Sequence, residues 1–321
     1  MGVGTNILGY ANTKIDNVVI RSIRNGNIST LNNYEEVELA EKLIELHPGL
    51  DMVKFARTGG EACAIAIRIA RASQTISRHK VAICGYHGWH DWYLSSNLDD
   101  KKNLNNHLIS SLDPIGVPSF LKKTCYQFNY GDYNKFNELT LKSSIGIIMM
   151  EVSRNKKIDL KFLRHIKKVC KKKNIILIFD ECTSGFRETL GGIYKKINIQ
   201  PDMLILGKAL GNGYPITAVL GKRGIMDCAK NSFISSTFWT ERLGPVAALK
   251  TLEIMEKMKS WKIITENGIY LNNKWKKIAK ENKLKIDIYG LASISKFEII
   301  SDKFMLYKTY ITQQMLKKGF L

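Results

Sequence analysis

A lysine between glycines is the residue of this 321-residue chain whose surroundings point most directly to covalent chemistry. Lys208 lies in the segment Gly-Lys-Ala-Leu-Gly-Asn-Gly (207–213), immediately after the apolar run 203–206. Its ε-amine can form a Schiff base with a carbonyl compound once its pKa is low enough to leave some neutral amine. Phosphate binding by a P-loop lysine requires the order GxxxxGK[ST], which this segment lacks. The segment therefore favours Lys208 as a nucleophilic amine.

Two more segments contain residues suited to binding a charged ring or a phosphate. Phe-Asp-Glu (179–181) ends an apolar run, and a carboxylate such as Asp180 at a strand end can keep a ring nitrogen protonated. A helix N-cap or a structural ion pair would use the same residue, so its role stays open at this point. Thr58, Gly59 and Gly60 open a helical pattern, whose free N–H groups and dipole attract an anion. Because glycine pairs also form ordinary turns, that segment is weak evidence on its own.

Short apolar runs and helical patterns alternate along the chain, and these elements must position the polar residues. The runs at 81–84, 145–150, 175–179 and 203–206 suit parallel strands buried on both faces, whereas 33–46 and 60–72 have helical spacing. The alternation predicts an α/β fold with a doubly wound, mostly parallel sheet. Ligands of such sheets bind at the carboxyl ends of the strands. Those ends carry Tyr86, His87, Glu151, Asp180 and Lys208.

His87 has two possible roles. A histidine two residues after a strand end can act as a general base or can cap a turn. Since Lys208 is available as the base, the structural role is favoured.

A change of pattern after Met258 predicts a second domain. Residues 260–283 form a lysine-rich helical pattern, 285–289 and 294–300 resemble strands, and 304–318 has helical spacing. We therefore divide the chain into an N-terminal segment (1–33), a large domain (34–258) and a smaller α+β domain (259–321).

The net charge of +20 is the strongest compositional signal. A nucleic acid or an anionic membrane surface would explain it. However, much of the charge falls in 156–173, where one buried stripe and one solvated basic face account for the run. We therefore expect neither partner. The expected stripe is Leu160, Leu163, Ile166, Val169 and Cys170.

Hydropathy and cysteine usage narrow the class further. No run approaches 18 apolar residues, and the first residues lack a secretory pattern. Six cysteines without a CxxC pair or a histidine at ligand spacing indicate reduced thiols in a cytoplasmic protein and no metal site.

Taken in order, the motifs resemble the class III aminotransferases, including the glutamate-1-semialdehyde 2,1-aminomutases. The similar segments are VKFARTGGEACAIAIRIARA (53–72), GYHGWHDW (85–92), LIFDECTSGFR (177–187), PDMLILGKALGNGYPITAVLG (201–221) and STFWTERLGPVAALKTLE (236–253). The resemblance runs through most of the chain. It implies fold type I of the pyridoxal-phosphate (PLP) dependent transferases, with a large PLP-binding domain and a small domain.

The resemblance also implies a role for each candidate site residue. Lys208 would bind PLP as a Schiff base and move the proton between substrate and cofactor, and Asp180 would pair with the pyridine nitrogen. Thr58, Gly59 and Gly60 would hold the phosphate. Tyr86 would stack on one face of the ring, and Cys182 would support the other face, where the family usually has valine. The residues expected to brace the site from behind are His87, Glu151, Glu61 and Arg187.

Thr237 is expected to act across a subunit boundary. In the resembling family this segment reaches the phosphate of the neighbouring subunit, which implies a homodimer with shared sites. The Thr-Glu-Arg that follows (240–242) stands where the family usually has Gly-Asn-Pro, and Arg57 and Gly60 also depart from the usual residues.

Three functions follow. The first is PLP-dependent transfer of an amino group between a small-molecule amino donor and a carbonyl acceptor. The second is an intramolecular aminomutase acting on glutamate-1-semialdehyde or a similar molecule. The third is a catalytically weak fragment, since Met1 and Leu321 both fall inside the family pattern and the small domain would be truncated. The departures lie around the pocket, so the substrate is not readable from the sequence.

Overall fold

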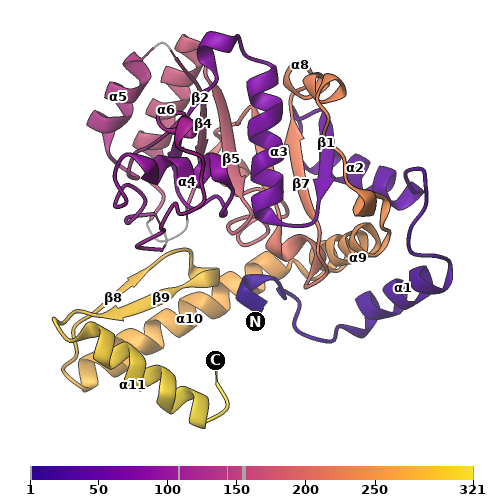
Figure 1. Ribbon diagram of the computed structural model, residues 1–321. Helices are drawn as coiled ribbons and strands as arrows, with labels where there is room; N and C mark the ends of the chain where they lie inside the picture. Colours follow the sequence, from indigo (N-terminus) through magenta and orange to yellow (C-terminus); the bar gives the residue numbers. More distant parts are fainter. Residues whose placement is uncertain (1, 108, 143, 154–156, 321) are drawn as a thin grey trace.

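Seven strands form one sheet in the computed structural model, which describes residues 2–107, 109–142, 144–153 and 157–320 (Figure 1). The order across the sheet is β1-β7-β6-β5-β4-β2-β3. Their bounds are β1 Met52–Ala56, β2 Lys80–Cys84, β3 Cys125–Gln127, β4 Ile145–Met150, β5 Ile176–Glu181, β6 Met203–Leu206 and β7 Thr217–Gly221. The four predicted strands are confirmed, and β1, β3 and β7 are additions.

The direction of the strands decides where their ends meet. β6, β5, β4, β2 and β3 pair in parallel, whereas β7 runs antiparallel to both β6 and β1. Six strands therefore point the same way and β7 points back. The carboxyl ends of β1, β2, β4, β5 and β6 consequently share one edge, and it is the edge to which the sequence assigned the polar residues.

Helices cover both faces of the sheet. Successive residues of a strand point to opposite faces, and in the central strands the residues on both faces are apolar. Ala82 and Cys84 belong to one buried cluster, whereas Val81 and Ile83 belong to the other. The first cluster packs against α2 Tyr34–Leu46, α5 Tyr133–Leu141, α6 Leu160–Lys173, α7 Tyr194–Ile197 and α9 Leu243–Met258. The second packs against α3 Gly59–Ala72, α4 Asp91–Leu94 and α8 Arg223–Met226. This confirms the predicted doubly wound α/β architecture.

The basic helix α6 differs from its prediction in two ways. It begins at Leu160, because the carboxylate of Asp159 caps its first turn by accepting from Phe162 N at 3.0 Å; residues 154–156 lie outside the described residues. The prediction that Leu160 is buried was wrong: as the first helical residue it is 39% exposed. Phe162 takes its place beside Leu163, Ile166 and Cys170.

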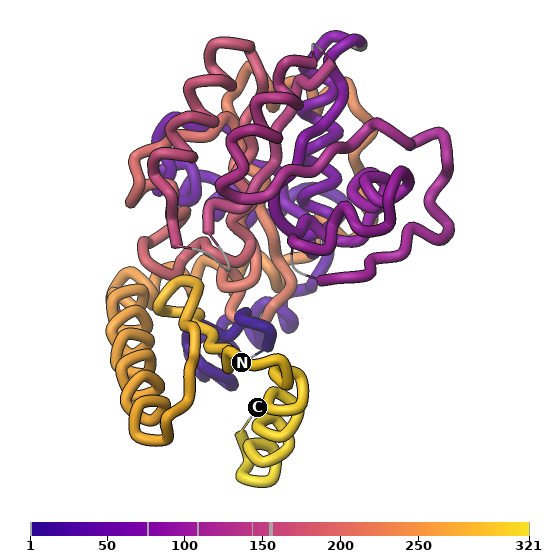
Figure 2. The backbone as a smooth tube through the Cα atoms, turned by 90° about the vertical axis from the view of Figure 1, so that its left-hand side faces the viewer, coloured from indigo at the N-terminus to yellow at the C-terminus, as the bar shows by residue number. Residues whose placement is uncertain are grey.

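The elements after Met258 lie beside the main sheet and not in it (Figures 1 and 2). A long helix, α10 Ser260–Glu281, is followed by the antiparallel pair β8 Ile286–Tyr289 and β9 Lys296–Ile299 and by α11 Phe304–Lys317. Both views place the N-terminus at the junction between these elements and the sheet-bearing part. The helix α1 Thr13–Arg24 packs on α9 through Ile15 and Val19. The domain boundaries at 33 and 258 stay predictions.

Among the described residues, no helix is both long and apolar enough to cross a membrane. All six cysteines are described, and none of them forms a disulfide.

Candidate active site

Asp180 lies at the carboxyl end of β5 with its side chain almost fully enclosed. Its Oδ2 accepts from His87 Nδ1 at 2.8 Å and from Cys63 Sγ at 3.4 Å, and its Oδ1 accepts from Cys182 N at 3.1 Å. No described helix begins at Asp180, so the N-cap alternative for this residue is excluded. A buried carboxylate in this position requires donors, and three elements supply them.

His87 is enclosed next to Asp180 as one of its hydrogen-bond partners. It is 1% exposed and packs against the rings of Trp92 and Tyr93. Cys63, His87 and Asp180 bring one ligand atom each to within 4.8 Å of one another. Hydrogen bonds account for this grouping, because burial and the charge of Asp180 hold the pKa of the Cys63 thiol well above its ordinary value. In this arrangement the Cys63 thiol donates to Asp180 Oδ2.

Lys208 follows β6, and its ε-amine donates to Thr183 Oγ1 at 2.9 Å. Thr183 lies two residues beyond the end of β5, so this bond joins the lysine to the same strand end as Asp180. The backbone of Lys208 has φ +32°, a left-handed conformation that costs free energy for a residue with a side chain. Strained residues of this kind concentrate at functional sites.

The segment Thr58-Gly59-Gly60 begins α3, as predicted. Thr58 is the N-cap: its Oγ1 accepts from Glu61 N at 3.3 Å, and Glu61 Oε2 accepts from Thr58 N at 3.3 Å and from Arg57 N at 2.8 Å. This reciprocal capping box leaves the N–H groups of Gly59 and Gly60 free to face an anion at the positive end of a 14-residue helix. Glu61 thus closes the first turn of α3.

Gly60 and His90 explain one departure from the family pattern. A Cβ at position 60 would lie 2.8 Å from His90 Cε1 and 2.9 Å from His90 Nδ1. A serine or threonine there would collide with the imidazole, which stacks on Trp89 with 4.7 Å between ring centroids. The histidine and the glycine therefore fit one another.

The side chain of Cys182 lies close to both Gly59, at the start of α3, and Gly207, directly before Lys208. A Cβ at Gly59 would lie 3.4 Å from its Sγ, and a Cβ at Gly207 would lie 3.0 Å from it. Burial, followed by the charge of Asp180, raises the pKa of the thiol well above its ordinary value. Cys182 therefore presents a neutral surface between Asp180 and Lys208.

Tyr86 and Glu151 follow the neighbouring strands β2 and β4, and the side chain of Glu151 contacts the backbone of Tyr86. Tyr86 N donates to Glu151 Oε2 at 3.1 Å, and a Cβ at Gly85 would lie 2.7 Å from that oxygen. The glycine has φ +126°, so the strand can turn sharply over the carboxylate. Glu151 is thereby a buried anchor for the segment that carries Tyr86.

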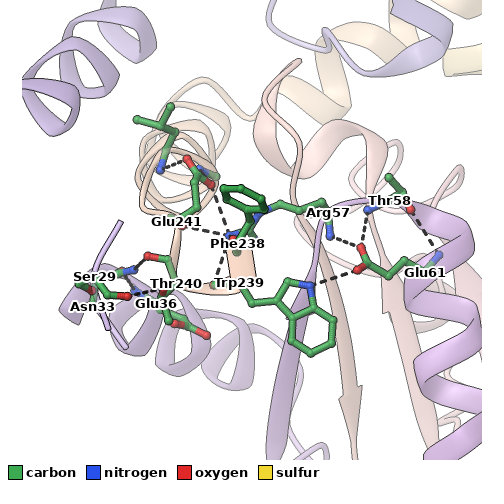
Figure 3. A network of polar contacts seen from close by, with 12 residues as sticks. Ser29, Asn33, Glu36, Arg57, Thr58, Glu61, Phe238, Trp239, Thr240 and Glu241 are labelled. Carbon is green, nitrogen blue, oxygen red and sulfur yellow. Dashed lines mark hydrogen bonds and ion pairs between the residues drawn. The ribbon is translucent and has the colours of Figure 1, made fainter. Parts of the chain in front are cut away.

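Thr237 lies apart from the residues above, at the start of the exposed turn Thr237–Thr240. Figure 3 shows how the turn is held: Trp239 Nε1 donates to Glu61 Oε1 at 3.1 Å, and Arg57 Nη2 donates to three backbone oxygens at 2.9–3.2 Å. Glu241, which follows the turn, is 3.3 Å from the same guanidinium. The structure does not bring Thr237 together with the other candidates by any described contact within the chain.

Several residues near the site escaped sequence reasoning. Thr183, in a loop, contacts Lys208, and Cys63, in a helix, contacts Asp180. Both residues lie in segments that resemble the family, but sequence reasoning assigned neither of them a role. Glu181, fully buried, accepts backbone N–H from Ile193 and Tyr194, and burial raises its pKa to about 7. The position of Glu181 next to Asp180 was the only sign in the sequence that it belongs to the site. Its hydrogen-bond donors could not be predicted, because they lie 12 and 13 residues further along the chain.

Comparison with known proteins gives the family. A model described as aminotransferase class-III matches residues 1–321. The chain belongs to the class III aminotransferases. The 3-aminobutyryl-CoA aminotransferase of Cloacimonas acidaminovorans (strain Evry) is 32% identical over 320 residues, which are 97% of this chain and 73% of that protein. The glutamate-1-semialdehyde 2,1-aminomutase of Methanococcoides burtonii is 29% identical over 330 residues, 100% of this chain and 76% of that protein.

Solved structures agree on the fold. An omega-transaminase from Sphaerobacter thermophilus has a TM-score of 0.81 at 24% identity, covering 92% of this chain and 70% of its own. The ornithine aminotransferase of Toxoplasma gondii ME49 has a TM-score of 0.83 at 20% identity, covering 100% of this chain and 76% of its own. The predicted fold type I and the resemblance to class III are confirmed.

The chain is therefore a PLP-dependent enzyme, and its residues fit the cofactor. A free helix N-terminus suits a phosphate, a buried carboxylate suits a pyridinium, and a lysine amine lies at the same sheet edge. The tight glycines at 59 and 207 leave a flat cradle against Cys182 that a Cβ would fill.

Proposed function

We propose that the class III aminotransferase chain transfers an amino group between a small-molecule amino donor and a carbonyl acceptor. The observation that carries the proposal is the convergence at one sheet edge of the Lys208 amine, held by Thr183 at 2.9 Å, and the buried Asp180 carboxylate. A transaminase needs an amine that binds the cofactor and a negative charge for its ring nitrogen.

Each residue then has one task. PLP, when bound, supplies the electron sink for the reaction. The Lys208 ε-amine would hold the cofactor through its carbonyl group and, once released, would carry a proton to and from the substrate carbon. Asp180 keeps the pyridine nitrogen protonated, and His87 and Cys63 hold that carboxylate in place. The free N–H groups of α3 and the Thr58 hydroxyl bind the phosphate, while Tyr86 and Cys182 cover the two faces of the ring.

We further propose a homodimer in which Thr237 completes the phosphate site of a second copy. The turn supports this arrangement because Thr237 is exposed and its neighbour Phe238 is 65% exposed. Phe233, a few residues upstream, is 88% exposed. An apolar surface of this kind favours contact with another protein. A cytoplasmic location is also part of the proposal, in which the six cysteines stay reduced.

An intramolecular aminomutase is the second candidate. Several similar proteins, such as those of Methanococcoides burtonii and Sulfolobus acidocaldarius, are glutamate-1-semialdehyde 2,1-aminomutases, with 29% and 32% identity. Both activities would use the same cofactor residues, so the difference lies in the substrates that enter.

Incubation with single amino donors separates the two activities. PLP-loaded protein is mixed with one common amino acid at a time, without an acceptor, and the keto product is quantified. A transaminase releases up to one keto product per site for at least one donor. If no donor yields keto product, while glutamate-1-semialdehyde is isomerised, the aminomutase replaces our proposal. The Lys208→Ala protein is the control, and we expect it to release none.

A further inference from the structure

Arg57 holds the turn that carries Thr237 at several points. Its Nη2 donates to the carbonyl oxygens of Phe238 at 2.9 Å, of Trp239 at 3.2 Å and of Glu241 at 3.1 Å. The Glu241 carboxylate lies 3.3 Å from the same nitrogen, and both side chains are about 15% exposed, at 15% and 14%. Three backbone carbonyls and one carboxylate thus gather around one guanidinium nitrogen, and this shared charged donor holds the turn in its shape.

The Glu241 carboxylate also binds the backbone at the start of the next helix, α9. Its Oε1 accepts from Leu243 N at 2.6 Å and its Oε2 from Gly244 N at 3.3 Å, so the carboxylate also caps α9. The turn is joined to the N-terminal segment as well, since Thr240 Oγ1 donates to Ser29 O at 2.5 Å. Among the described contacts, Arg57 bonds to two residues of the turn, Phe238 and Trp239, and to Glu241 directly after it.

Arg57 and Glu241 are both departures from the family pattern, and they meet in space although 184 positions separate them. Arg57 also directly precedes Thr58, the first residue of the phosphate-binding segment. Its backbone N–H donates to Glu61, and Glu61 accepts from Trp239 of the turn. One arginine is therefore fixed to this chain's own phosphate-binding helix through its backbone and to the turn through its side chain (Figure 3).

We propose that Arg57 is a positioning residue that acts in trans: by shaping the turn, it presents Thr237 to the phosphate site of the second copy in the dimer. The inference rests on the proposed function and dimer. It predicts that loss of the Arg57 side chain weakens PLP binding in the partner subunit and leaves the subunit that carries the change nearly unaffected.

Heterodimers with one covalent site test this directly. Two differently tagged chains are purified as a mixed dimer, and one chain carries Lys208→Ala so that only the other can be fixed to PLP by borohydride. In the first dimer, Arg57→Ala is placed on the Lys208→Ala chain; in the second, it is placed on the chain that keeps Lys208. The readout is the PLP concentration at which half of the intact Lys208 chains become labelled, measured by mass spectrometry.

We expect the first dimer to need roughly tenfold more PLP, corresponding to one lost charge-assisted contact with phosphate, and the second to match a dimer without Arg57→Ala. Thr237→Val should reproduce this pattern. Arg68→Ala is the matched control, because Arg68 also donates to a backbone carbonyl on this surface, that of Phe233 at 2.9 Å, but does not touch the turn. It should leave both dimers unchanged.

The opposite pattern, with the loss confined to the second dimer, would show that Arg57 serves its own phosphate site and would overturn the inference. An equal loss in both dimers, or a chain that stays monomeric with PLP bound, would overturn it as well. A wild-type chain that shows no label on Lys208 at any PLP concentration would instead refute the proposed function itself.

Discussion

The Glu61 carboxylate joins the phosphate-binding helix to the Trp239 turn, and Glu61→Gln tests that junction. The carboxylate accepts from Arg57 N at 2.8 Å and Thr58 N at 3.3 Å on one oxygen and from Trp239 Nε1 at 3.1 Å on the other. A glutamine has only one acceptor oxygen. Whichever way its amide turns, its –NH₂ group faces an N–H donor and one side of the junction is lost.

The magnitude follows from the kind of bond that is lost. Hydrogen bonds to charged groups contribute about 1.5–3 kcal/mol, and a donor left without an acceptor costs more when it is buried. Trp239 is only half-buried, so water can reach its indole N–H and the lower end applies. We expect Glu61→Gln to reduce the free energy of unfolding by about 1.5–2 kcal/mol.

A double-mutant cycle with Trp239→Phe isolates the bond. For this cycle Glu61→Ala replaces the glutamine variant, because Glu61→Ala and Trp239→Phe each remove the Glu61–Trp239 hydrogen bond. The double variant should lose that bond only once, giving a coupling energy of about 1–1.5 kcal/mol in urea denaturation. Glu138→Gln, in an exposed pair with Lys135, is the control and should not change the midpoint measurably. A coupling energy below about 0.3 kcal/mol would refute the reasoning. The Glu61→Gln variant should also bind PLP more weakly, while its affinity for pyridoxal without phosphate stays unchanged.

Three further predictions concern charge, pH and packing. Asp180→Asn keeps the shape of the side chain but removes the negative charge that would face the ring nitrogen. The half-reaction rate should therefore fall roughly 100-fold or more, while the melting temperature falls by only about 2–4 °C. A rate within threefold of wild type would contradict the assignment of Asp180. Burial lowers the pKa of His47 to about 4, although the hydrogen bond with Leu43 O acts in the opposite direction. As the pH falls, the unfolded chain therefore protonates His47 before the folded chain does. The free energy of unfolding should decrease between pH 6.5 and pH 4, by on the order of 3 kcal/mol in total. His47→Gln should make the free energy of unfolding less dependent on pH in this range, and an unchanged pH dependence would exclude His47 as its cause. A Cβ at Gly268 of α10 would lie 1.8 Å from Ala292 O, so Gly268→Ala should destabilise the C-terminal elements by about 1–3 kcal/mol, whereas Gly224→Ala, with no atom within 4 Å, should be neutral or stabilising in the same melts.

The central strands were predictable because burial on both faces leaves a continuous apolar run. β4 and β6 match their predicted bounds, because each apolar run is followed at once by Glu151 or by Gly207 and Lys208. β1 was missed because Lys54 interrupts its apolar pattern. In the fold that lysine stands over the ring of Trp239, with 4.8 Å from Nζ to the ring centroid. A partner nearly two hundred residues away cannot be read from local periodicity.

The candidate site shows the same division. The types and order of Asp180, Lys208 and the glycines were visible in the sequence, because their chemistry restricts them to strand ends. The sequence did not reveal that His87 and Cys63 both donate to Asp180, or that Arg57 faces Glu241. Such contacts depend on which strands become neighbours, and that is decided by the packing of the whole sheet.

Borohydride reduction of the PLP-loaded protein, followed by peptide mass spectrometry, tests the central claim most directly. The reduction fixes the cofactor to whichever amine binds it. We expect a single PLP adduct per chain, located on Lys208, and none in the Lys208→Ala protein, even though that protein can still bind PLP through its phosphate. An adduct on a different lysine, or equal labelling of the Lys208→Ala protein, would contradict the assignment of Lys208.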